Sequence, residues 1–330
     1  QEKLNQATSL RLVSDVKIST SLSGGVDSSV IFSELNSIND SILELNPFIV
    51  KYDGNITYEL AINLCKKFGR EPFVVESKDY QNIDNILETF NHLEKKQPYS
   101  KQLDLYKSQN KNGYKISIDG HGADECLGGY TENLKDFAIS TQNSLVNVYE
   151  SINHISNNTL LEILKKNFLT PINKYIDVDL SQNFLTNKKF QYIETNEKLQ
   201  INENLRKDLE LLKNFDFSFQ SLYLKSNYGF LQWLLNKWDR ASMRNSVEIR
   251  SPFLDYNLFQ FALSIPMYQK VSKGQNKSIL RDAYKQKLPE EIINFKAKQG
   301  LPSNKNQKYR NLIFENSINE KGFIESNLWD

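Results

Sequence analysis

Cysteine, histidine and long apolar runs are scarce in this chain, and neither sign of charge dominates. The 330 residues contain two cysteines, Cys65 and Cys126, which are too few for a framework of disulfides and fit a reducing compartment. No apolar run approaches the roughly 18–20 residues that a membrane-spanning helix needs. Lysine and arginine number 41 against 40 aspartates and glutamates, so the basic face that usually marks a nucleic-acid partner is not indicated. We therefore expect a cytoplasmic protein with neither a membrane nor a nucleic acid as its partner.

The chain also lacks a targeting signal and a metal-binding pattern of histidines and cysteines. Its first residues, QEKLNQATSLRL, contain no basic region followed by an apolar stretch. The first residue is Gln rather than Met, which leads us to expect a piece of a longer polypeptide. The three histidines, at positions 92, 121 and 154, and the two separated cysteines give no zinc pattern.

What the first 130 residues do contain is an alternation of apolar, β-rich runs with helical stretches. The runs cover residues 16–23, 42–52, 71–77 and 114–120. The helical stretches cover residues 26–39, 56–69, 82–96 and 103–113. This alternation predicts an α/β fold, with a parallel sheet of about five strands and flanking helices in the N-terminal half and a largely helical C-terminal half. Ligands of such sheets bind at the carboxyl ends of strands, where both glycine-rich turns of this region fall.

The patterns divide the chain into three regions. Residues 1–130 are predicted to form the α/β core, and residues 131–225 a helical variable region rich in Asn, Lys and Leu. Residues 226–330 are predicted to be helical and contain most of the later motifs. No Pro/Gly/Ser linker separates the halves, so we expect residues 1–330 to form one unit with an extended internal interface.

The segment SLSGGVDSS, residues 21–29, carries the first chemical signal. It follows a predicted strand and opens a predicted helix, so its glycines let the backbone approach a ligand and its N–H groups point toward an anion. Asp27 suits such a site where a divalent cation bridges it to phosphates, and Mg²⁺ prefers shells of carboxylate and phosphate. The mononucleotide P-loop motif GxxxxGK[ST] is absent. We predict that the nucleotide phosphates are held by Ser23, Gly24, Gly25, Asp27, Ser28 and Ser29.

These residues and three later motifs resemble a known family. SGGVDSS is similar to the SGGxDSS loop of the PP-loop ATP pyrophosphatases, which have an adenine nucleotide α-hydrolase-like fold. DGHGADECLGGY (119–130), DRASMRNSVEIRSPFLD (239–255) and KSILRDAYKQKLPEEIINFKAKQGLP (277–302) resemble motifs of the asparagine synthetase family, in the same order. The chain is therefore identified as a member of that family, as its synthetase domain.

The resemblance implies a carbon–nitrogen ligase that uses ATP and Mg²⁺. In this family a substrate carboxylate attacks the α-phosphorus of ATP, which gives an acyl-adenylate and pyrophosphate, and ammonia then displaces AMP. Such a reaction depends mainly on positioning and charge neutralisation. The commonest form converts aspartate to asparagine, with glutamine as the source of ammonia.

Individual residues take roles from the motifs that they match. The resemblance makes the loop from Ser23 to Ser29 the pyrophosphate site, and it makes Asp27 and Asp124 the magnesium ligands. The family's adenosine pocket falls on Leu22, Val50, Asp119 and Gly120. For Leu22 and Val50, strand core is an equally good interpretation, and both can hold.

The later motifs supply a catalytic lysine and several structural residues. Lys277 begins the KxxLR motif, where the family places a lysine that neutralises charge developing on the phosphates. Lys298 is a weaker candidate, because it could simply pair with a carboxylate. We expect structural roles, as a buried ion-pair scaffold or a helix N-cap, for Arg250, Asp239, Glu248 and Asp255.

His121 departs from the family pattern. The matching position is typically Glu in asparagine synthetases and Tyr in related β-lactam-forming enzymes, whereas DGHGADE resembles DGQGADE variants of surface-polysaccharide gene clusters. His121 could act as a general base on ammonium. It could equally donate a hydrogen bond to the substrate, or act only as a spacer.

Glutamine-dependent members of the family carry an N-terminal glutaminase domain, whose terminal cysteine makes ammonia from glutamine, and we expect this chain to be the synthetase half only. Cys65 lies on a predicted helical face and Cys126 inside the glycine-rich turn, so neither is expected to be the glutaminase nucleophile. Residues 1–15 resemble the helix that follows that domain. We expect it to be fused upstream or to be a separate chain, and this chain to use free ammonium but not glutamine. The oligomeric state is left open, with a homodimer as one option.

The acceptor is the main open question. Aspartate is the leading hypothesis, and the His121 variant motivates a second one, in which the same chemistry acts on a uronic acid or a nucleotide-sugar acid. A third hypothesis, of another class, is a non-catalytic partner with a degenerate site.

Overall fold

The computed structural model describes residues 1–38, 45–77, 100–130, 133, 136–137, 204–205, 207–228, 230–272 and 275–295. The predicted helix over residues 82–96, most of the variable region 131–225 and the end of the fourth motif lie outside the described residues. The chain divides into two compact units. The first comprises Gln1–His121, Leu234–Pro252 and Tyr284–Asp330, and the second comprises Gly122–Trp233 and Phe253–Ala283. The predicted region boundaries near residues 130 and 225 stay predictions.

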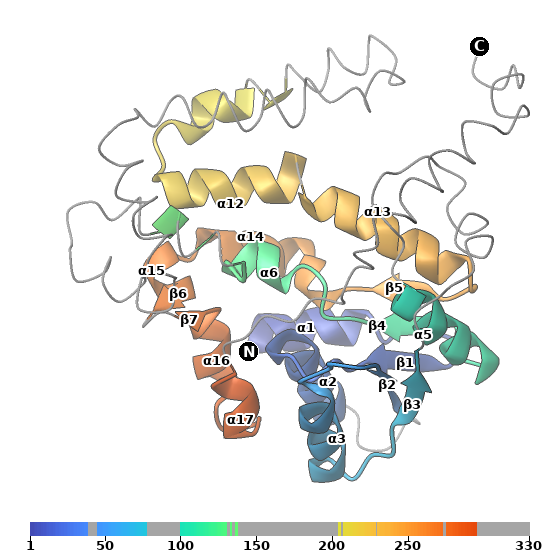
Figure 1. Cartoon of the computed structure of the whole chain (residues 1–330). Helices are drawn as coiled ribbons and strands as arrows, with labels where there is room; N and C mark the ends of the chain where they lie inside the picture. Colours follow the sequence, from blue (N-terminus) through green and yellow to red (C-terminus); the bar gives the residue numbers. More distant parts are fainter. Residues whose placement is uncertain are drawn as a thin grey trace, which may run out of the picture. The chain divides into compact units, whose positions relative to one another are not determined.

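A five-stranded parallel sheet forms the centre of the first unit and confirms the predicted α/β fold (Figure 1). Its order is β3-β2-β1-β4-β5, so β1 has β2 on one side and β4 on the other. Four of the strands lie within the predicted apolar runs and are shorter than those runs. They are β1 (Ile18–Ser21), β2 (Pro47–Lys51), β3 (Phe73–Glu76) and β4 (Ile116–Ile118).

The fifth strand corrects the expectation that all strands come from the N-terminal half. β5 (Glu248–Arg250) belongs to the third motif and pairs in parallel with β4. Backbone bonds extend this pairing at both ends, from Glu248 N to the Lys115 carbonyl (2.8 Å) and from Asp119 N to the Arg250 carbonyl (2.9 Å). With the sequence Glu-Ile-Arg, the strand is too short and too charged to show an apolar run, so only its pairing with β4 defines it.

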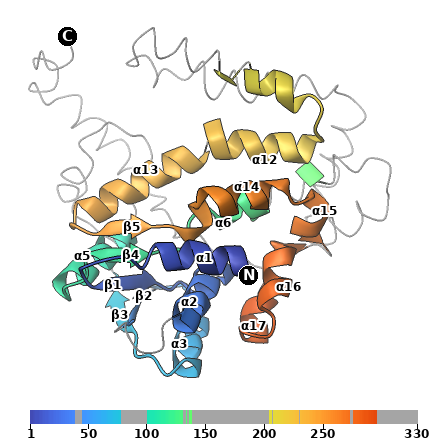
Figure 2. The same cartoon turned by 180° about the vertical axis from the view of Figure 1, so that it is seen from behind.

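The helices of the first unit begin and end close to the predicted stretches. α2 starts directly after the Gly24–Gly25 turn and is buried along most of its length, and α1 lies alongside it (Figure 2). In α3, Ala61, Leu64 and Cys65 are buried along one face, as expected of an amphipathic helix. The helices are α1 (Glu2–Leu10), α2 (Val26–Ile38), α3 (Tyr58–Lys67), α5 (Ser100–Lys111), the C-terminal part of α13 (Phe230–Met243) and α17 (Glu290–Ile293).

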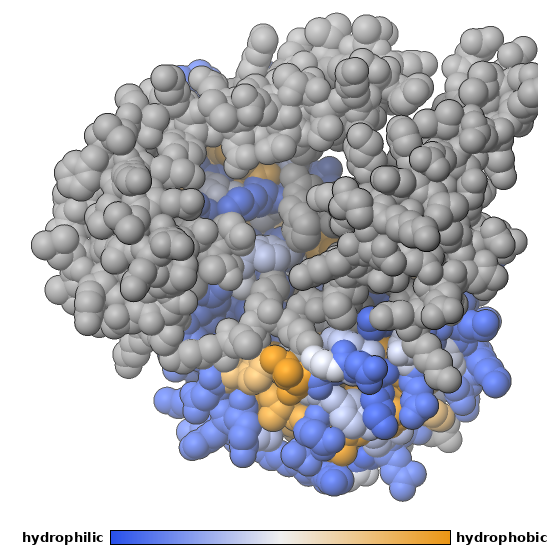
Figure 3. All heavy atoms as spheres, in the orientation of Figure 1, coloured by the Kyte–Doolittle hydropathy of each residue, from blue (hydrophilic) through white to orange (hydrophobic). Residues whose placement is uncertain are grey.

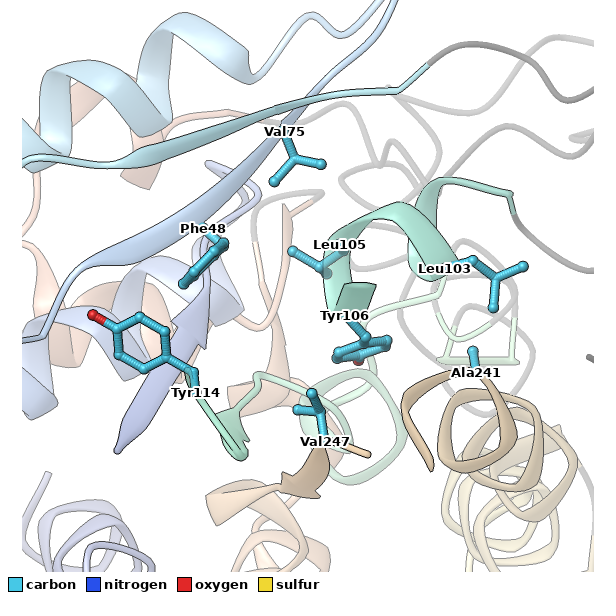
Figure 4. Packing of buried hydrophobic residues seen from close by; sticks show 8 residues of the cluster. All are labelled: Phe48, Val75, Leu103, Leu105, Tyr106, Tyr114, Ala241 and Val247. Atoms are coloured by element: carbon cyan, nitrogen blue, oxygen red, sulfur yellow. The ribbon is translucent and has the colours of Figure 1, made fainter. Parts of the chain in front are cut away.

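One hydrophobic cluster joins the sheet to α5 and α13 (Figure 4). Phe48 of β2 stacks on Phe73 of β3 with ring centroids 4.7 Å apart, and Tyr114 meets Phe48 edge-on at 5.4 Å. Tyr106 of α5 is completely buried in this cluster, beside Val247 just before β5. Burying side chains of this size contributes about 1.5–3 kcal/mol each. The cluster therefore fixes α5 and α13 against the strands of the sheet.

The second unit is built mainly of helices. α6 packs against both α12 and α14, and a small core contains Phe137, Leu222, Met267 and Val271. Asp255 accepts hydrogen bonds from the backbone N–H groups of Asn257 and Leu258, so it caps α14 as predicted. The elements are α6 (Ala123–Leu127), α12 (Phe217–Tyr228), the 3-10 helix η3 (Pro252–Leu254), α14 (Tyr256–Ser264), α15 (Met267–Lys270), β6 (Val271–Ser272), β7 (Gln275–Asn276) and α16 (Ser278–Tyr284).

The described surface is mainly hydrophilic in the view of Figure 3, with a few apolar side chains between the polar ones. Among the described residues, no helix combines the length and the apolar character that a membrane crossing requires.

Candidate active site

The turn after β1 can be formed only with glycine at position 24. Gly24 has φ +82°, and a Cβ atom there would lie 2.2 Å from the carbonyl oxygen of Thr57. The Thr57 hydroxyl in turn donates a hydrogen bond to the carbonyl of Ser23 over 2.6 Å. The segment that follows β2 therefore clamps the turn, and no side chain fits between them.

The serines of this turn form a small hydroxyl network at the start of α2. The hydroxyl oxygens of Ser23 and Ser28 lie 2.9 Å apart, and Gly25 N donates to the Ser23 hydroxyl over 3.3 Å. Ser23 is exposed and Ser28 is buried. Ser29 is completely buried, and its backbone N–H donates to the Gly25 carbonyl, which begins the helix. The exposed face of the turn thus presents the Ser23 hydroxyl and the first backbone N–H groups of α2.

The turn after β4 lies directly against the first turn of α2. A Cβ atom at Gly120 would come within 3.0 Å of the Asp27 carbonyl carbon and of the Ser28 nitrogen. Both glycine-rich turns therefore meet at the carboxyl edge of neighbouring strands, as parallel pairing predicted. The chain leaves β1 toward β2 and returns to β4 on the other side, so this is the switch point of the sheet, the usual ligand position in such folds.

Leu22 and Val50 both belong to the packed sheet. Leu22 is 1% exposed, and its N–H donates to the Phe48 carbonyl, which continues the pairing of β1 with β2. Val50 is partly exposed on β2 and packs against the cluster around Phe48. The strand-core interpretation therefore holds for both residues, and their role in an adenosine pocket stays a prediction.

Asp119 is buried and its carboxylate is held by two donors. The Tyr106 hydroxyl donates to Oδ2 over 2.9 Å, and the Ser117 hydroxyl donates to Oδ1 over 2.7 Å. Burial, together with the negative charge of Asp119 and this hydrogen bond, raises the pKa of Tyr106 well above its ordinary value. Tyr106 therefore stays a neutral donor, and the Asp119 side chain is fixed in one orientation.

His121 lies beside this carboxylate and on an aromatic ring. Its Nε2 atom is 3.7 Å from Asp119 Oδ2, and its ring centroid is 4.3 Å from that of Trp238. The His121 side chain is 15% exposed, so most of the ring is covered. These contacts place the ring, and the role of His121 stays a prediction.

In the second unit, Lys277 pairs with Asp124. Lys277 Nζ lies 2.9 Å from Asp124 Oδ1, and Lys277 is 6% exposed. Its φ of +55° lies in the left-handed region, which is uncommon for a non-glycine residue and recurs where a site fixes the backbone. Gly129 leaves room for the carboxylate, because a Cβ there would lie 1.8 Å from Asp124 Oδ1. The second and fourth motifs are thus joined within this unit.

Of the two predicted magnesium ligands, Asp27 belongs to the first unit and Asp124 to the second. Within the described ranges, no group of three or more His, Cys, Asp or Glu side chains could hold a metal ion. The magnesium assignment of Asp27 and Asp124 therefore stays a prediction.

The expected ion pair between Arg250 and Glu248 of the third motif is present. Arg250 donates to Glu248 over 2.8 Å and to the carbonyls of Arg11 and Val13 over 2.9 and 2.8 Å. It therefore ties the segment after α1 to β5. The ion pair is less buried than expected, because the Glu248 side chain is 57% exposed.

Of the other candidates, Asp239 accepts a hydrogen bond at its backbone carbonyl from Ser242, over 3.0 Å. Lys298, His92 and His154 lie outside the described residues.

Neither cysteine is placed to act as a nucleophile. Cys65 and Cys126 are both completely buried. Burial raises the pKa of the Cys65 thiol to about 12, so it is protonated at neutral pH.

Sequence reasoning missed Tyr106, Ser117 and Trp238, which surround Asp119 and His121. For Ser117 a local signal existed, because residues two apart on a strand point to the same face. Tyr106 comes from α5, where nothing in the local sequence marks it, and Trp238 directly precedes the third motif on α13.

Comparison with known proteins identifies the family. The asparagine synthase family profile matches residues 1–322. Two glutamine-hydrolyzing asparagine synthetases of Bacillus subtilis (strain 168) are similar: number 1 is 26% identical over 323 residues and number 3 is 24% identical over 347 residues. These alignments cover 92% and 94% of the chain but 49% and 48% of the relatives, so the chain spans about half their length. The amidase chyE of Penicillium rubens is 21% identical over 381 residues, which cover 99% of this chain and 56% of the amidase. The match over nearly the whole chain agrees with the ordered motifs and with the parallel sheet, and the chain belongs to the asparagine synthase family.

Proposed function

We propose that this chain catalyses ATP-dependent formation of an amide from a carboxylate and ammonia. The observation that carries the proposal is the meeting of the Ser23–Gly25 turn and the Asp119–Gly120 turn at the switch point of the sheet. A glycine-clamped turn that opens a long helix supplies backbone N–H groups and a positive dipole end, which suit the phosphates of ATP.

In the first step the acceptor carboxylate attacks the α-phosphorus, and the bond to the β-phosphate breaks to release pyrophosphate. Ser23 and the N–H groups at the start of α2 hold the departing pyrophosphate. Lys277 neutralises charge that develops on the phosphates as this bond breaks. A carboxylate is a weak nucleophile, so these groups act by position and charge rather than by covalent chemistry.

The donor set fits magnesium. Mg²⁺ is usually held by one or two protein carboxylates together with substrate phosphates and water, so a cluster of three protein ligands is not needed. Asp27 lies in the first turn of α2 and is partly exposed, and the Asp124 side chain is 19% exposed. Asp27 and Asp124 would hold the ion, which would offset the charge of the leaving pyrophosphate.

Aspartate is the acceptor that we propose first, because the asparagine synthetases of Bacillus subtilis align over most of this chain. A uronic acid or nucleotide-sugar acid is the alternative, since His121 stands where the family typically has Glu. A relative named as an amidase aligns over 99% of the chain, which also favours diversity of acceptors in this family. We propose that ammonia comes from a glutaminase domain, fused or separate.

Pyrophosphate release tests this proposal. The chain is incubated with Mg-ATP, ammonium and one acceptor at a time from a panel of aspartate, uronic acids and nucleotide-sugar acids. Release that depends on aspartate supports asparagine synthesis, and release with a sugar acid alone supports the alternative. If none of the acceptors in the panel supports pyrophosphate release, the proposal is contradicted. The proposed source of ammonia would be wrong if glutamine supported AMP formation by this chain as well as ammonium does.

Asp27→Asn is the matched variant. It keeps the size of the side chain and removes the charge, so acceptor-dependent pyrophosphate release should be lost while the circular dichroism spectrum is unchanged. Equal release by this variant would overturn the assignment of Asp27 to the metal.

A further inference from the structure

We propose that the side-chain amide of Gln102 binds the adenine base of ATP and recognises its 6-amino group. This inference rests on the proposed ATP-dependent function and deepens it, because it assigns a base-recognising side chain that lies in none of the four motifs. Gln102 belongs to the first turn of α5, within the first unit.

The Gln102 amide is buried and has no partner in the protein. The residue is 1% exposed. In the part of the chain that the structure describes, neither its amide oxygen nor its amide nitrogen has a hydrogen-bond partner. Buried polar groups in native proteins are nearly always paired, because an unpaired one costs free energy. A donor and an acceptor left open on one side chain are the pattern that a ligand with the complementary pair would satisfy.

The face of α5 that carries Gln102 points to the carboxyl ends of the strands. Gln102, Tyr106 and Gln109 are spaced by four and three residues, so they share one face of the helix. Gln109 Nε2 donates to the hydroxyl of Ser117, within β4, over 3.0 Å. One turn earlier, the Tyr106 hydroxyl donates to Asp119, directly after β4, over 2.9 Å. Gln102 lies one further turn in the same direction, and therefore past the end of the strand.

Contacts with the two other strands of this edge agree with that position. Lys101 Nζ lies 4.7 Å from the ring centroid of Tyr52, the residue directly after β2. The hydroxyl of Ser77, directly after β3, donates to the Asp104 carboxylate over 2.6 Å. The first turn of α5 therefore lies at the carboxyl ends of β2 and β3, and Gln102 follows Lys101 there.

The base is the part of ATP that suits this position. The proposed phosphate turn follows β1, which has β2 as its neighbour in the sheet. Neighbouring strands lie about 4.8 Å apart, so one nucleotide spans the ends of both. With the phosphates at the turn after β1, the base extends over the end of β2 toward α5. Val50, which the sequence predicts for the adenosine pocket, lies on β2.

The amide and adenine have complementary hydrogen-bonding groups. Adenine carries an amino donor beside a ring-nitrogen acceptor, and a primary amide carries an oxygen acceptor beside an amino donor. The same bidentate pairing allows Asn and Gln side chains to bind adenine in DNA. Gln102 Oε1 would accept from the 6-amino group, and Nε2 would donate to the ring nitrogen next to it. Both open atoms of Gln102 are then paired.

Binding of two nucleotides tests the contact directly. Purine riboside triphosphate has hydrogen in place of the 6-amino group, and isothermal titration calorimetry with Mg²⁺ and no acceptor measures its affinity beside that of ATP. The wild type should bind ATP about 10-fold more tightly, since the analogue loses one hydrogen bond and leaves Oε1 unpaired. Gln102→Met keeps the length of the side chain and removes both hydrogen-bonding atoms. It should bind ATP about 10-fold more weakly than the wild type and bind the two nucleotides within about 3-fold of each other.

Leu103→Met is the matched control, because it changes the neighbouring buried residue of α5 without touching the amide. Its preference for ATP over the analogue should equal that of the wild type.

Stability without nucleotide gives a readout that a structural role would move the other way. Gln102→Met removes two unpaired polar atoms from a buried position, so its midpoint of urea unfolding should be higher than that of the wild type. Saturating ATP should reduce this difference, because the nucleotide binds the wild type more tightly. A lower midpoint for Gln102→Met without ATP would show that the amide stabilises the fold, and it would overturn the inference.

The binding outcomes separate this inference from the proposed function. If Gln102→Met keeps the wild-type preference for ATP, or if the wild type binds both nucleotides equally, the amide does not contact the 6-amino group. The proposed function stands in both cases, because the wild type still binds ATP. A wild type that binds neither nucleotide would contradict the proposed function itself, and the inference with it.

Discussion

Lys270 offers a measurable effect of burial on stability. It is 1% exposed in the second unit, and its ammonium group donates to the Leu263 carbonyl at the end of α14 over 3.1 Å. Burial lowers the pKa of Lys270 from 10.5 to about 8, and the electrostatic influence of Cys126 and Asp216 opposes this shift. The folded protein therefore holds a positive charge at neutral pH in a place that disfavours it.

The sign and size of the effect follow from linkage. Between pH 8 and 10.5 the unfolded chain binds more protons at this lysine than the folded chain does, so the free energy of unfolding rises with pH in that window. A shift of this size corresponds to about 3 kcal/mol. Lys270→Met keeps the length of the side chain and removes the charge. Between pH 7 and pH 10.5, the free energy of unfolding of the wild type should therefore rise by about 3 kcal/mol relative to that of this variant.

Urea unfolding followed by tryptophan fluorescence at a series of pH values measures this difference. Loss of the hydrogen bond to Leu263 lowers the free energy of unfolding of the variant by about 1–3 kcal/mol at every pH. The test is therefore how the difference between the two proteins changes with pH, and not its size at one pH. Other titrating groups cancel in the difference between the two proteins. Lys285→Met is the control, because that exposed side chain stays in water on folding and its difference should be flat. A flat difference for Lys270→Met as well would refute the reasoning.

Two further predictions concern the turn after β1 and the buried thiol. Gly24→Ala should destabilise the protein by clearly more than Gly54→Ala and abolish pyrophosphate release: both glycines have positive φ, at a cost of about 1–2 kcal/mol for alanine, but only a Cβ at Gly24 meets backbone, 2.2 Å from Thr57 O. Equal midpoints of urea unfolding for the two variants would contradict the clamped turn. Cys65 should not react with a thiol reagent such as Ellman's reagent at pH 8 in the native protein, because its thiol is completely buried with a pKa of about 12, and it should react fully in guanidinium chloride. Rapid reaction of the native protein would show that the Cys65 thiol on α3 is accessible to solvent, which would contradict this prediction.

Local signals in the sequence determined much of the fold. The runs that became β1, β2, β3 and β4 were predictable, because residues that favour strands gather in short stretches that helical patterns and turn residues separate. The starts of α2 and α14 followed from Gly24–Gly25 and from Asp255, whose effects act over a few residues. The family followed from ordered motifs, and its profile matches residues 1–322.

Only the tertiary structure decided how these parts combine. The strand order and the origin of β5 depend on pairing between distant segments, which a three-residue strand cannot signal by itself. In the same way, His121 was visible in the sequence as a departure from a motif, but its neighbours were not. Tyr106 and Trp238 reach Asp119 and His121 from α5 and α13, and packing across the sheet, rather than any local pattern, brings them there. The residue types that the proposed chemistry needs are present in the motifs, whereas the orientation of His121 is set by side chains that only folding brings together.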